Sequence, residues 1–326
     1  MNERARTGAG RLVAVVVTHN RPHQLRVTLA RLLEAPEAEL AAVVVVDNAS
    51  SDGETGRVLD AMSGPRLDVF RSETNLGGAG GFEQGMRRAM AEHAPDWLVV
   101  MDDDARPEPG ALAAFHACDL AGWEGVGAAV YCPDGSICDM NRPAFNPFRS
   151  ARLFLRTAMG GGREAFHLGP EDYRGPERRV DILSFVGLFL SRAAVERVGY
   201  PDPGLFLYGD DLLYTLGLTE AGGRLKFAPG VRFEHDFTSH KGGVKRFVPL
   251  WKCYYHHRNL LMIYRRIAGP LFWPALLLIL PKWLSKIRHY SGERRLFLRL
   301  IGAALRDGLA GRTGTDHATV VARFTR

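Results

Sequence analysis

Short apolar runs alternate with amphipathic segments along the first hundred residues. The apolar runs have the length and the valine content of buried strands, and the segments between them repeat apolar residues at helical spacing. In order, the predicted strands and helices span residues 12–17, 22–33, 42–46, 54–62, 67–70, 82–93 and 97–101. This alternation predicts an α/β fold in which a Rossmann-like, mostly parallel sheet is flanked by helices and binds its ligand at the carboxyl ends of the strands.

The second half of the chain is less regular. A stretch rich in Pro, Gly and Arg follows Tyr131 and extends to about Arg179, where we expect a long surface excursion or an acceptor loop. Beyond it we predict strands at 180–185, 224–227 and 231–237, a short helix at 193–198 and a helix opened by Asp210 and Asp211. The expected organisation is an N-terminal tail (1–10), an α/β domain (11–240) and a basic, aromatic helical region (241–326).

Composition excludes several classes of protein. Hydrophobic residues make up 46% of the 326 residues and charged residues 24%, a globular balance that argues against disorder. The four cysteines show neither CxxC spacing nor a histidine in zinc-finger register, which predicts reduced thiols in a cytosolic protein. The first ten residues contain no apolar core of the kind that a signal peptide has.

Positive charge is concentrated in residues 241–326. This segment contains 17 Lys or Arg against three acids, a formal charge of +14, whereas the preceding 240 residues carry −8. The apolar stretch 271–281 inside it is shorter than the roughly 20 residues of a membrane-spanning helix. We interpret it either as a segment lying on an anionic membrane surface or as a buried core or oligomerisation helix. The acidic body opposes nucleic acid binding.

Three consecutive carboxylates, Asp102, Asp103 and Asp104, follow the strand at 97–101. Adjacent carboxylates repel one another, and a hard divalent cation such as Mn²⁺ or Mg²⁺ relieves that repulsion. In an extended segment Asp102 and Asp104 share a face and could hold one ion together. His235, between two acids, is a usable manganese ligand from a late strand. The alternatives are a solvated acidic turn and a surface histidine.

Other polar residues also fall at predicted strand ends. Asp47 ends the second strand, and the glycine-rich run 75–81 precedes a helix, whose N-terminus attracts phosphate. That run lacks the lysine and serine of a P-loop, and no G-x-G-x-x-G follows the first strand. Thr18 or Asn20 could cap the first helix, and the acids at 210–211 could serve only as caps of theirs.

Six motifs, taken together and in this order, resemble the family 2 glycosyltransferases of the GT-A fold, over residues 11 to about 265. The last two are more narrowly similar to the galactofuranosyltransferase and rhamnosyltransferase branch. The motifs are Val17–Pro22, Val46–Gly53, Asn75–Gly81, Met101–Asp104, Gly209–Asp211 and Glu234–Phe237.

The resemblance implies a role for each of these positions. Asp211 would be the general base, Asp210 would bind the acceptor, and Asp102, Asp104 and His235 would hold Mn²⁺ or Mg²⁺. The nucleotide-sugar donor would be bound by Thr18, Asn20, Arg21, Asp47, Asn75, Gly77, Gly78 and Asp103. The segment Tyr254–Asn259 resembles an aromatic and Arg-Asn element that follows the catalytic domain in such enzymes. We expect this segment to lie on a helix that packs beneath the site. Leu188 and Phe189 replace the tryptophan-rich acceptor wall of galactofuranosyl enzymes, which leaves the donor sugar and the acceptor open.

The predicted function is therefore metal-dependent, inverting transfer of a sugar, with galactofuranose or rhamnose favoured, from a UDP- or dTDP-sugar to a cell-surface glycan or lipid-linked glycan. The expected location is cytoplasmic, peripheral on the inner face of the cell membrane, and a homo-oligomer is compatible with the basic tail. Two other functions are considered: a sugar-phosphate nucleotidyltransferase, which would normally show a glycine-rich first loop with a lysine, and a non-catalytic nucleotide- or glycan-binding subunit.

Overall fold

Valine-rich segments form the centre of the sheet. In the computed structural model, which describes residues 9–157, 159, 162–237 and 246–324, every residue of β1 (Leu12–Thr18) and β2 (Ala42–Asp47) is buried. Valine is stiff at χ1 and packs well on a pleated surface, so an unbroken valine run suits a strand covered on both faces. β3 (Leu67–Arg71) and β4 (Trp97–Asp102) complete the parallel part, as predicted.

Among the described residues the sheet has nine strands, in the order β3-β2-β1-β4-β8-β6-β9-β5, with β7 paired to β9. The second half adds β5 (Ala105–Pro107), β6 (Gly125–Tyr131), β7 (Arg178–Val180), β8 (Leu188–Ser191) and β9 (Leu225–His235). β8 runs antiparallel between β4 and β6, whereas β6 and β9 are parallel. The predicted mostly parallel α/β sheet is confirmed, with an antiparallel insertion.

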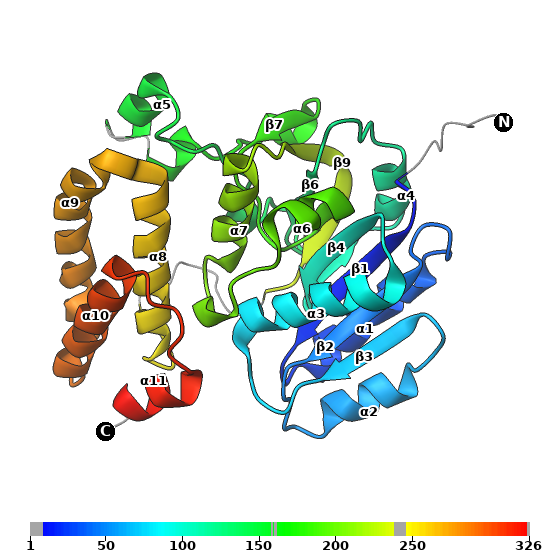
Figure 1. The fold of residues 1–326 in the computed structure, drawn as a ribbon, viewed down its shortest axis with the longest axis horizontal. Helices are drawn as coiled ribbons and strands as arrows, with labels where there is room; N and C mark the ends of the chain where they lie inside the picture. The colour runs from blue at the N-terminus through cyan, green and yellow to red at the C-terminus, as the bar shows by residue number, and fades with distance from the viewer. Residues whose placement is uncertain (1–8, 158, 160–161, 238–245, 325–326) are drawn as a thin grey trace.

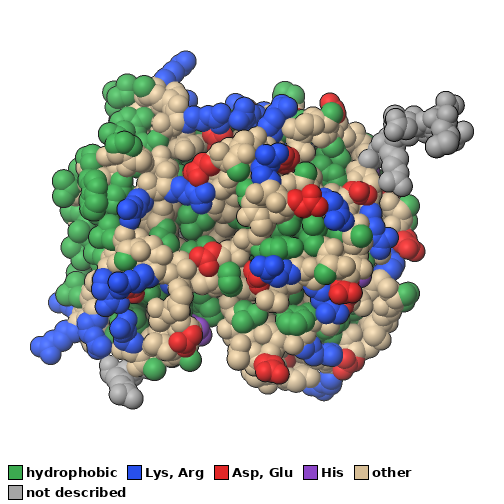
Figure 2. All heavy atoms as spheres, viewed as in Figure 1, with side chains coloured by type: hydrophobic (Ala, Val, Ile, Leu, Met, Phe, Trp, Pro, Cys, Tyr) green, Lys and Arg blue, Asp and Glu red, His purple; other side chains and the backbone are tan. Residues whose placement is uncertain are grey.

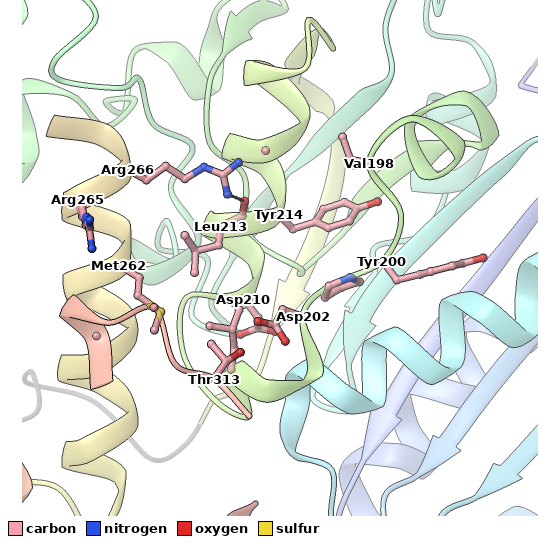
Figure 3. Close-up of a pocket in the computed structure, with 15 residues that line it drawn as sticks. Val198, Tyr200, Asp202, Asp210, Leu213, Tyr214, Met262, Arg265, Arg266 and Thr313 are labelled. Atoms are coloured by element: carbon pink, nitrogen blue, oxygen red, sulfur yellow. Dashed lines mark hydrogen bonds between the residues drawn. The ribbon is translucent and has the colours of Figure 1, made fainter. Parts of the chain in front are cut away.

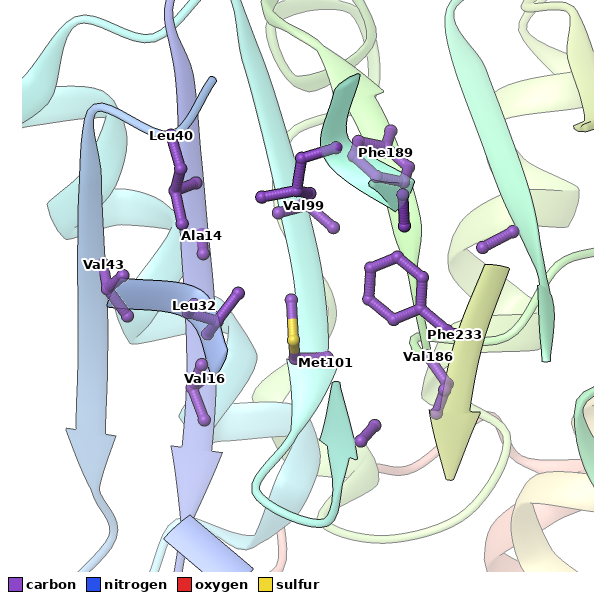
Figure 4. Close-up of a cluster of buried hydrophobic side chains, with 14 of the residues drawn as sticks. Ala14, Val16, Leu32, Leu40, Val43, Val99, Met101, Val186, Phe189 and Phe233 are labelled. Carbon is purple, nitrogen blue, oxygen red and sulfur yellow. The ribbon is translucent and has the colours of Figure 1, made fainter. Parts of the chain in front are cut away.

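Helices cover both faces of the sheet (Figure 1). α1 (Pro22–Glu34), α2 (Glu54–Ala61) and α4 (Ala111–His116) pack over one face, where Leu32, Val99 and Phe189 belong to one buried cluster (Figure 4). α3 (Gly77–His93), α6 (Arg192–Val198) and α7 (Asp210–Glu220) cover the other. Each crossover helix returns the chain to the edge where the next parallel strand begins. The carboxyl ends of these strands and their polar residues therefore lie together at the opposite edge.

Two strand predictions were wrong in detail. Residues 181–185 do not form a strand, because the Asp181 carboxylate accepts the Asn146 N–H and pairs with Arg149, which holds this segment against the excursion. The two late strands are one strand, β9, whose register against β6 shifts at a bulge formed by Pro229–Val231. A proline has no N–H to donate to the ladder, and a bulge absorbs it.

The excursion after Tyr131 contains short helical segments rather than a single loop. They are η1 (Asp139–Asn141), α5 (Ala151–Arg156), η3 (Gly162–Ala165) and η4 (Asp172–Arg174). Ala144 in this region bridges His167 and Ile182, which ties the excursion to the sheet domain. Part of the excursion is therefore buried structure next to β9, although its sequence predicted a surface segment.

The C-terminal region is helical, as predicted, and stands beside the sheet domain (Figure 1). It contains α8 (Lys252–Ala268), α9 (Phe272–Ser285), α10 (Arg294–Leu309) and α11 (His317–Phe324), with a core of its own that includes Tyr254, Phe297 and Val320. The predicted domain boundary at residues 240/241 and most of the predicted tail at 1–10 lie outside the described residues.

The segment Lys252–His289 is long and apolar enough to cross a membrane by length and composition alone, with a mean hydropathy of 1.5 over an 18-residue window. Figure 1 shows that it doubles back at η6 (Gly269–Leu271), so that α8 and α9 form a hairpin. The 14 residues of α9 extend about 21 Å, less than the about 30 Å of a bilayer core. Only Phe272 and Trp283 of α9 are buried, so it is not a buried core helix.

Glycines of α3 allow this helix to lie against β1. A Cβ added at Gly85 would come within 2.5 Å of Val15 Cγ1 and 3.0 Å of Val46 Cγ2, whereas a Cβ at Gly56 in α2 would meet nothing within 4 Å. The two positions therefore form a matched pair. Close packing requires a glycine at Gly85, whereas no neighbouring atom restricts a side chain at Gly56.

We expect Gly85→Ala to lower the free energy of unfolding by about 1–3 kcal/mol, because overpacking outweighs the gain in helix propensity. Gly56→Ala should instead raise the free energy of unfolding by up to about 1 kcal/mol. Chemical denaturation of both variants measures the difference. A stabilised Gly85→Ala variant would contradict the close approach of α3 to β1.

Candidate active site

Two carboxylates and one imidazole meet at the carboxyl edge of the sheet. β4 ends at Asp102, the chain turns through Asp103 and Asp104, and β5 then pairs antiparallel with β9 so that Ala105 lies opposite His235. The potential ligand atoms of Asp102, Asp104 and His235 lie within 4.8 Å of one another, and His235 Nε2 is 3.2 Å from Asp104 Oδ1. The structure therefore brings together the three residues predicted as metal ligands.

The electrostatics of this centre favour a cation. Burial, together with the charge of Asp104, raises the pKa of Asp102 to about 8. Burial also works to raise the pKa of Asp104, but the hydrogen bond and charge of His235 and the nearby Arg21 keep that pKa below its ordinary value. Oxygen ligands suit Mg²⁺ and Mn²⁺, and one imidazole suits Mn²⁺. This set of residues fits either ion.

Asp103, the middle acid, has a different role from its neighbours. Its carboxylate accepts a hydrogen bond from Thr18 Oγ1 at 2.6 Å and one from Arg21 Nη1 at 3.4 Å. Its backbone carbonyl accepts from the buried Thr28 hydroxyl at 2.7 Å. Burial raises the pKa of Asp103 to about 6, against the charge of Arg21. Asp103 therefore joins the end of β1 and the helix α1 to the turn that carries the two outer acids.

Arg21 lies between this turn and solvent. Its Nη1 donates to Asp104 Oδ2 at 2.5 Å, while 47% of its side chain stays exposed. Arg21 also occupies the N-cap position of α1 and makes no side-chain cap. The predicted cap by Thr18 or Asn20 was wrong, because Thr18 binds Asp103 and the side-chain Oδ1 of Asn20 accepts the N–H groups of Ser51 and Asp52.

The other predicted donor-binding residues lie in loops along the same edge. Asp47 Oδ1 accepts the Ser50 N–H at 3.0 Å, and Asn75 Oδ1 accepts the Gly77 N–H at 2.8 Å. Asn48, which sequence reasoning did not assign, accepts the Leu76 N–H and donates to the Gly77 carbonyl, joining the loop after β2 to the start of α3. Its position beside Asp47 is the one signal that could have identified it.

The glycine-rich run is helix rather than loop. α3 starts at Gly77, five residues earlier than predicted, and its first amides already have acceptors. Leu76 and Gly77 donate to the side chains of Asn48 and Asn75, and Ala79 donates to the Phe206 carbonyl. The glycines serve close packing: a Cβ on Gly77 would lie 2.1 Å from the Phe206 oxygen. Phosphate binding by Gly77 and Gly78 stays a prediction.

The acids Asp210 and Asp211 open α7, as predicted. Burial and the charge of Asp211 raise the pKa of Asp210 to about 7, and burial raises that of Asp211 to about 6. The charge of Asp210 also contributes to the raised pKa of Asp102, so the two pairs of acids interact electrostatically. Half-buried carboxylates with raised pKa values at the edge of a sheet are candidates for proton transfer.

Hydrogen bonds from α8 fix the loop before these acids. Phe206 (φ 64°) and Tyr208 (φ 69°) adopt a backbone conformation that costs a side-chain-bearing residue about 1–3 kcal/mol. Asn259 Nδ2 donates to the carbonyls of Leu205, Leu207 and Tyr208, within 3.0 Å in each case. Arg258, fully buried, donates to the carbonyls of Gly204 and Leu205. The predicted helical placement of Tyr254–Asn259 is confirmed, and this helix packs against the loop before α7.

A cleft of about 700 Å³ opens between α7 and the C-terminal helices (Figure 3). Among the predicted site residues only Asp210 lines it, so the cleft meets the carboxylate edge at that side chain. Its other polar lining includes Tyr200, Asp202, Arg265, Arg266 and Thr313.

Comparisons with known proteins agree with this fold. A GalNAc-T7 structure with UDP, GalNAc and Mn²⁺ superposes with a TM-score of 0.53 at 16% identity, covering 78% of this chain and 47% of that one. The mannosyltransferase PcManGT from Pyrobaculum calidifontis, in complex with GDP-Man and Mn²⁺, gives 0.51 at 19% identity, covering 96% and 79%. The fold is that of the GT-A glycosyltransferases.

Residues 13–131 match the family described as glycosyl transferase family 2. Galactofuranosyltransferase GlfT1 of Mycobacterium tuberculosis is 33% identical over 201 residues, 61% of either chain. Galactofuranosyltransferase GlfT2 of Mycolicibacterium smegmatis is 26% identical over 93% of this chain and 48% of its own length. The predicted resemblance to family 2 glycosyltransferases is confirmed, and the chain spans 61% and 48% of the length of these two relatives.

We expect Mn²⁺ to raise the melting temperature more at pH 8 than at pH 6. Because the folded pKa of Asp102 lies above its ordinary value, the folded state keeps a proton that the unfolded chain has lost. The contribution of Asp102 to stability without metal should therefore fall as pH rises from about 4 to about 8, and a bound cation should cancel that loss.

Thermal unfolding at both pH values, with EDTA or with Mn²⁺, measures this effect. Asp104→Ala is the control and should abolish the Mn²⁺-dependent increase at either pH. An equal or larger increase at pH 6 in the unsubstituted protein would count against binding through Asp102.

Proposed function

We propose that this protein transfers a sugar from a UDP- or dTDP-sugar to a hydroxyl of a cell-surface glycan or lipid-linked glycan, with inversion at the anomeric carbon. The observation that carries this proposal is the convergence of Asp102, Asp104 and His235 with the acids at the start of α7 on one sheet edge. Galactofuranose is the favoured sugar, because the similar curated proteins are named galactofuranosyltransferases. Rhamnose is the second choice.

The residues have separate tasks in this reaction. Asp102, Asp104 and His235 would hold Mn²⁺ or Mg²⁺, which neutralises charge on the departing nucleoside diphosphate. The acceptor oxygen bonds to the anomeric carbon as the carbon–oxygen bond to the diphosphate breaks, and the hydroxyl proton passes to Asp211. With a pKa of about 6, Asp211 is largely ionised at neutral pH and can accept it. Asp210, at the cleft, would hold the acceptor.

The donor would lie across the loops after β1, β2 and β3. Arg21, half exposed beside Asp104, has donors left for a diphosphate oxygen. Thr18 and Asp103 would act mainly by fixing the position of Arg21, whereas Asn20, Asp47 and Asn75 shape the loops that would surround the nucleoside. The loop after β1 has no lysine, which disfavours a nucleotidyltransferase. A non-catalytic binding subunit would not need the two acids at the start of α7, which disfavours that alternative.

Release of nucleoside diphosphate from a set of UDP- and dTDP-sugars, with Mn²⁺, Mg²⁺ or EDTA, tests the function. The expected result is metal-dependent release from one donor in the presence of a glycan acceptor. Equal release in EDTA would contradict metal dependence, and formation of nucleotide-sugar from sugar phosphate would favour the nucleotidyltransferase.

We expect Asp211→Asn to lower turnover by about 10²- to 10⁴-fold, because the amide keeps the shape of the side chain but cannot take the proton. Donor and Mn²⁺ affinity should stay near normal, as isothermal titration measures. Loss of donor affinity together with activity would make Asp211 a donor-binding residue, and Asp210 would be the next candidate for the base.

We also propose that α9 rests on an anionic membrane surface from the cytoplasmic side. Leu277 and Leu278 are 75% and 72% exposed, and Trp273 is also exposed. Figure 2 shows hydrophobic side chains gathered along the edge formed by α9, with Lys and Arg side chains near it. Apolar side chains bordered by basic residues suit the headgroup region of such a membrane. The alternative is that a second copy of this chain covers α9 in a homo-oligomer.

Vesicle flotation separates the two possibilities. The protein should float with anionic vesicles at low salt, and the double substitution Leu277→Ser/Leu278→Ser should weaken binding about tenfold or more. Val27→Ser, a control at an exposed position on α1, should bind normally. Failure to bind anionic vesicles at low salt, with a larger particle in solution that the double substitution dissociates, would support the oligomer instead.

A further inference from the structure

His235 contacts the protein through both ring nitrogens. Nε2 faces Asp104 Oδ1 at 3.2 Å, on the side of the carboxylates, and Nδ1 lies 2.8 Å from Asn141 Oδ1 on the opposite side. Asn141 belongs to η1 in the excursion after β6 and is buried, as His235 is. The second contact therefore comes from a part of the chain that none of the sequence motifs includes.

The orientation of the Asn141 amide follows from its other neighbours. The Cys138 thiol lies 2.8 Å from Oδ1 and can donate to it, while Nδ2 donates to Ser184 Oγ at 3.0 Å. The thiol lies farther from His235 Nδ1, at 3.8 Å, so its hydrogen goes to the nearer Asn141 atom, and a reversed amide would place NH₂ hydrogens against that hydrogen and against sulfur, a weak acceptor. The Ser184 hydroxyl can donate or accept, so the thiol decides that the oxygen faces His235.

This orientation selects one tautomer of His235. An amide oxygen can only accept, so Nδ1 must carry the hydrogen that lies between it and Asn141. In the neutral ring, the Nε2 lone pair then faces Asp104 Oδ1 at 3.2 Å, so either a proton or a metal cation must lie between these two atoms. A metal-binding histidine typically donates its other N–H to an oxygen, which fixes the ring and makes it a better ligand.

We propose that Asn141 is a positioning residue of the metal centre: its Oδ1 holds His235 in the tautomer and ring orientation that present Nε2 to a divalent cation. This inference rests on the metal site of the proposed function. Asn141 is itself fixed at three points, by Ser184, by the Cys138 thiol and by its own N–H, which donates to the Cys138 carbonyl at 3.0 Å. The excursion therefore contributes to metal affinity without contacting the ion.

Mn²⁺ affinity, measured by the electron paramagnetic resonance signal of free Mn²⁺ without any sugar transfer, tests this role. We expect Asn141→Ala to weaken Mn²⁺ binding about 10- to 100-fold. Asn141→Asp keeps an acceptor oxygen opposite Nδ1 and should bind Mn²⁺ at least as tightly as the unsubstituted protein. Asn146→Ala is the matched control, because Asn146 lies in the same excursion and its side chain accepts only the Phe148 N–H. Its affinity should not change.

Ser184→Ala provides a second, milder test, since it leaves Asn141 in place and removes only the partner of Nδ2. It should weaken Mn²⁺ binding less than Asn141→Ala while circular dichroism and metal-free UDP affinity stay unchanged. A folded Asn141→Ala variant with normal Mn²⁺ affinity would overturn the inference and leave the proposed function standing. Equal losses in the Ala and Asp variants would show a packing role only. An unsubstituted protein that binds no Mn²⁺ would overturn the metal centre and the role of Asn141 together.

Discussion

The antiparallel pairing of β5 with β9 is the contact on which the site depends. It places Ala105 opposite His235, so an imidazole from late in the chain reaches the turn that carries Asp102 and Asp104. Without this pairing the turn would be an acidic loop at the end of β4. The bulge at Pro229–Val231 adjusts the register of β9, because it lets the strand follow β6 along its whole length and still end beside β5.

Mutual repulsion among carboxylates is the cost of this arrangement, and the surrounding residues offset part of it. Arg21 and Thr18 neutralise or bind the other two acids, Asp104 and Asp103. Asp102 itself is left without such a partner among the described hydrogen bonds and ion pairs, and burial raises its pKa to about 8. A centre with one uncompensated acid is therefore suited to receive a cation, which adds charge where the protein supplies none.

The C-terminal helices hold the second pair of acids in place. Arg258 and Asn259 donate to backbone carbonyls of the loop before α7, and His317 of α11 stacks on Phe206 with 4.0 Å between ring centroids. Phe206 also accepts the Ala79 N–H of α3. The strained loop is thus fixed between the sheet domain and the helical region, and α8 takes part in the site although it contributes no side chain to the carboxylate edge.

The sequence by itself determined the first half of the fold and the chemistry of the strand ends. Valine runs such as β1 identify strands because their periodicity and burial are local properties, and Asp102, Asp104 and Asp211 follow directly from the motifs. Only the tertiary structure decided where β8 inserts, that Asp103 turns away from its neighbours, and that Asn141 lies against His235. Those depend on contacts between residues as many as 94 positions apart, which no local pattern of apolar and polar residues encodes.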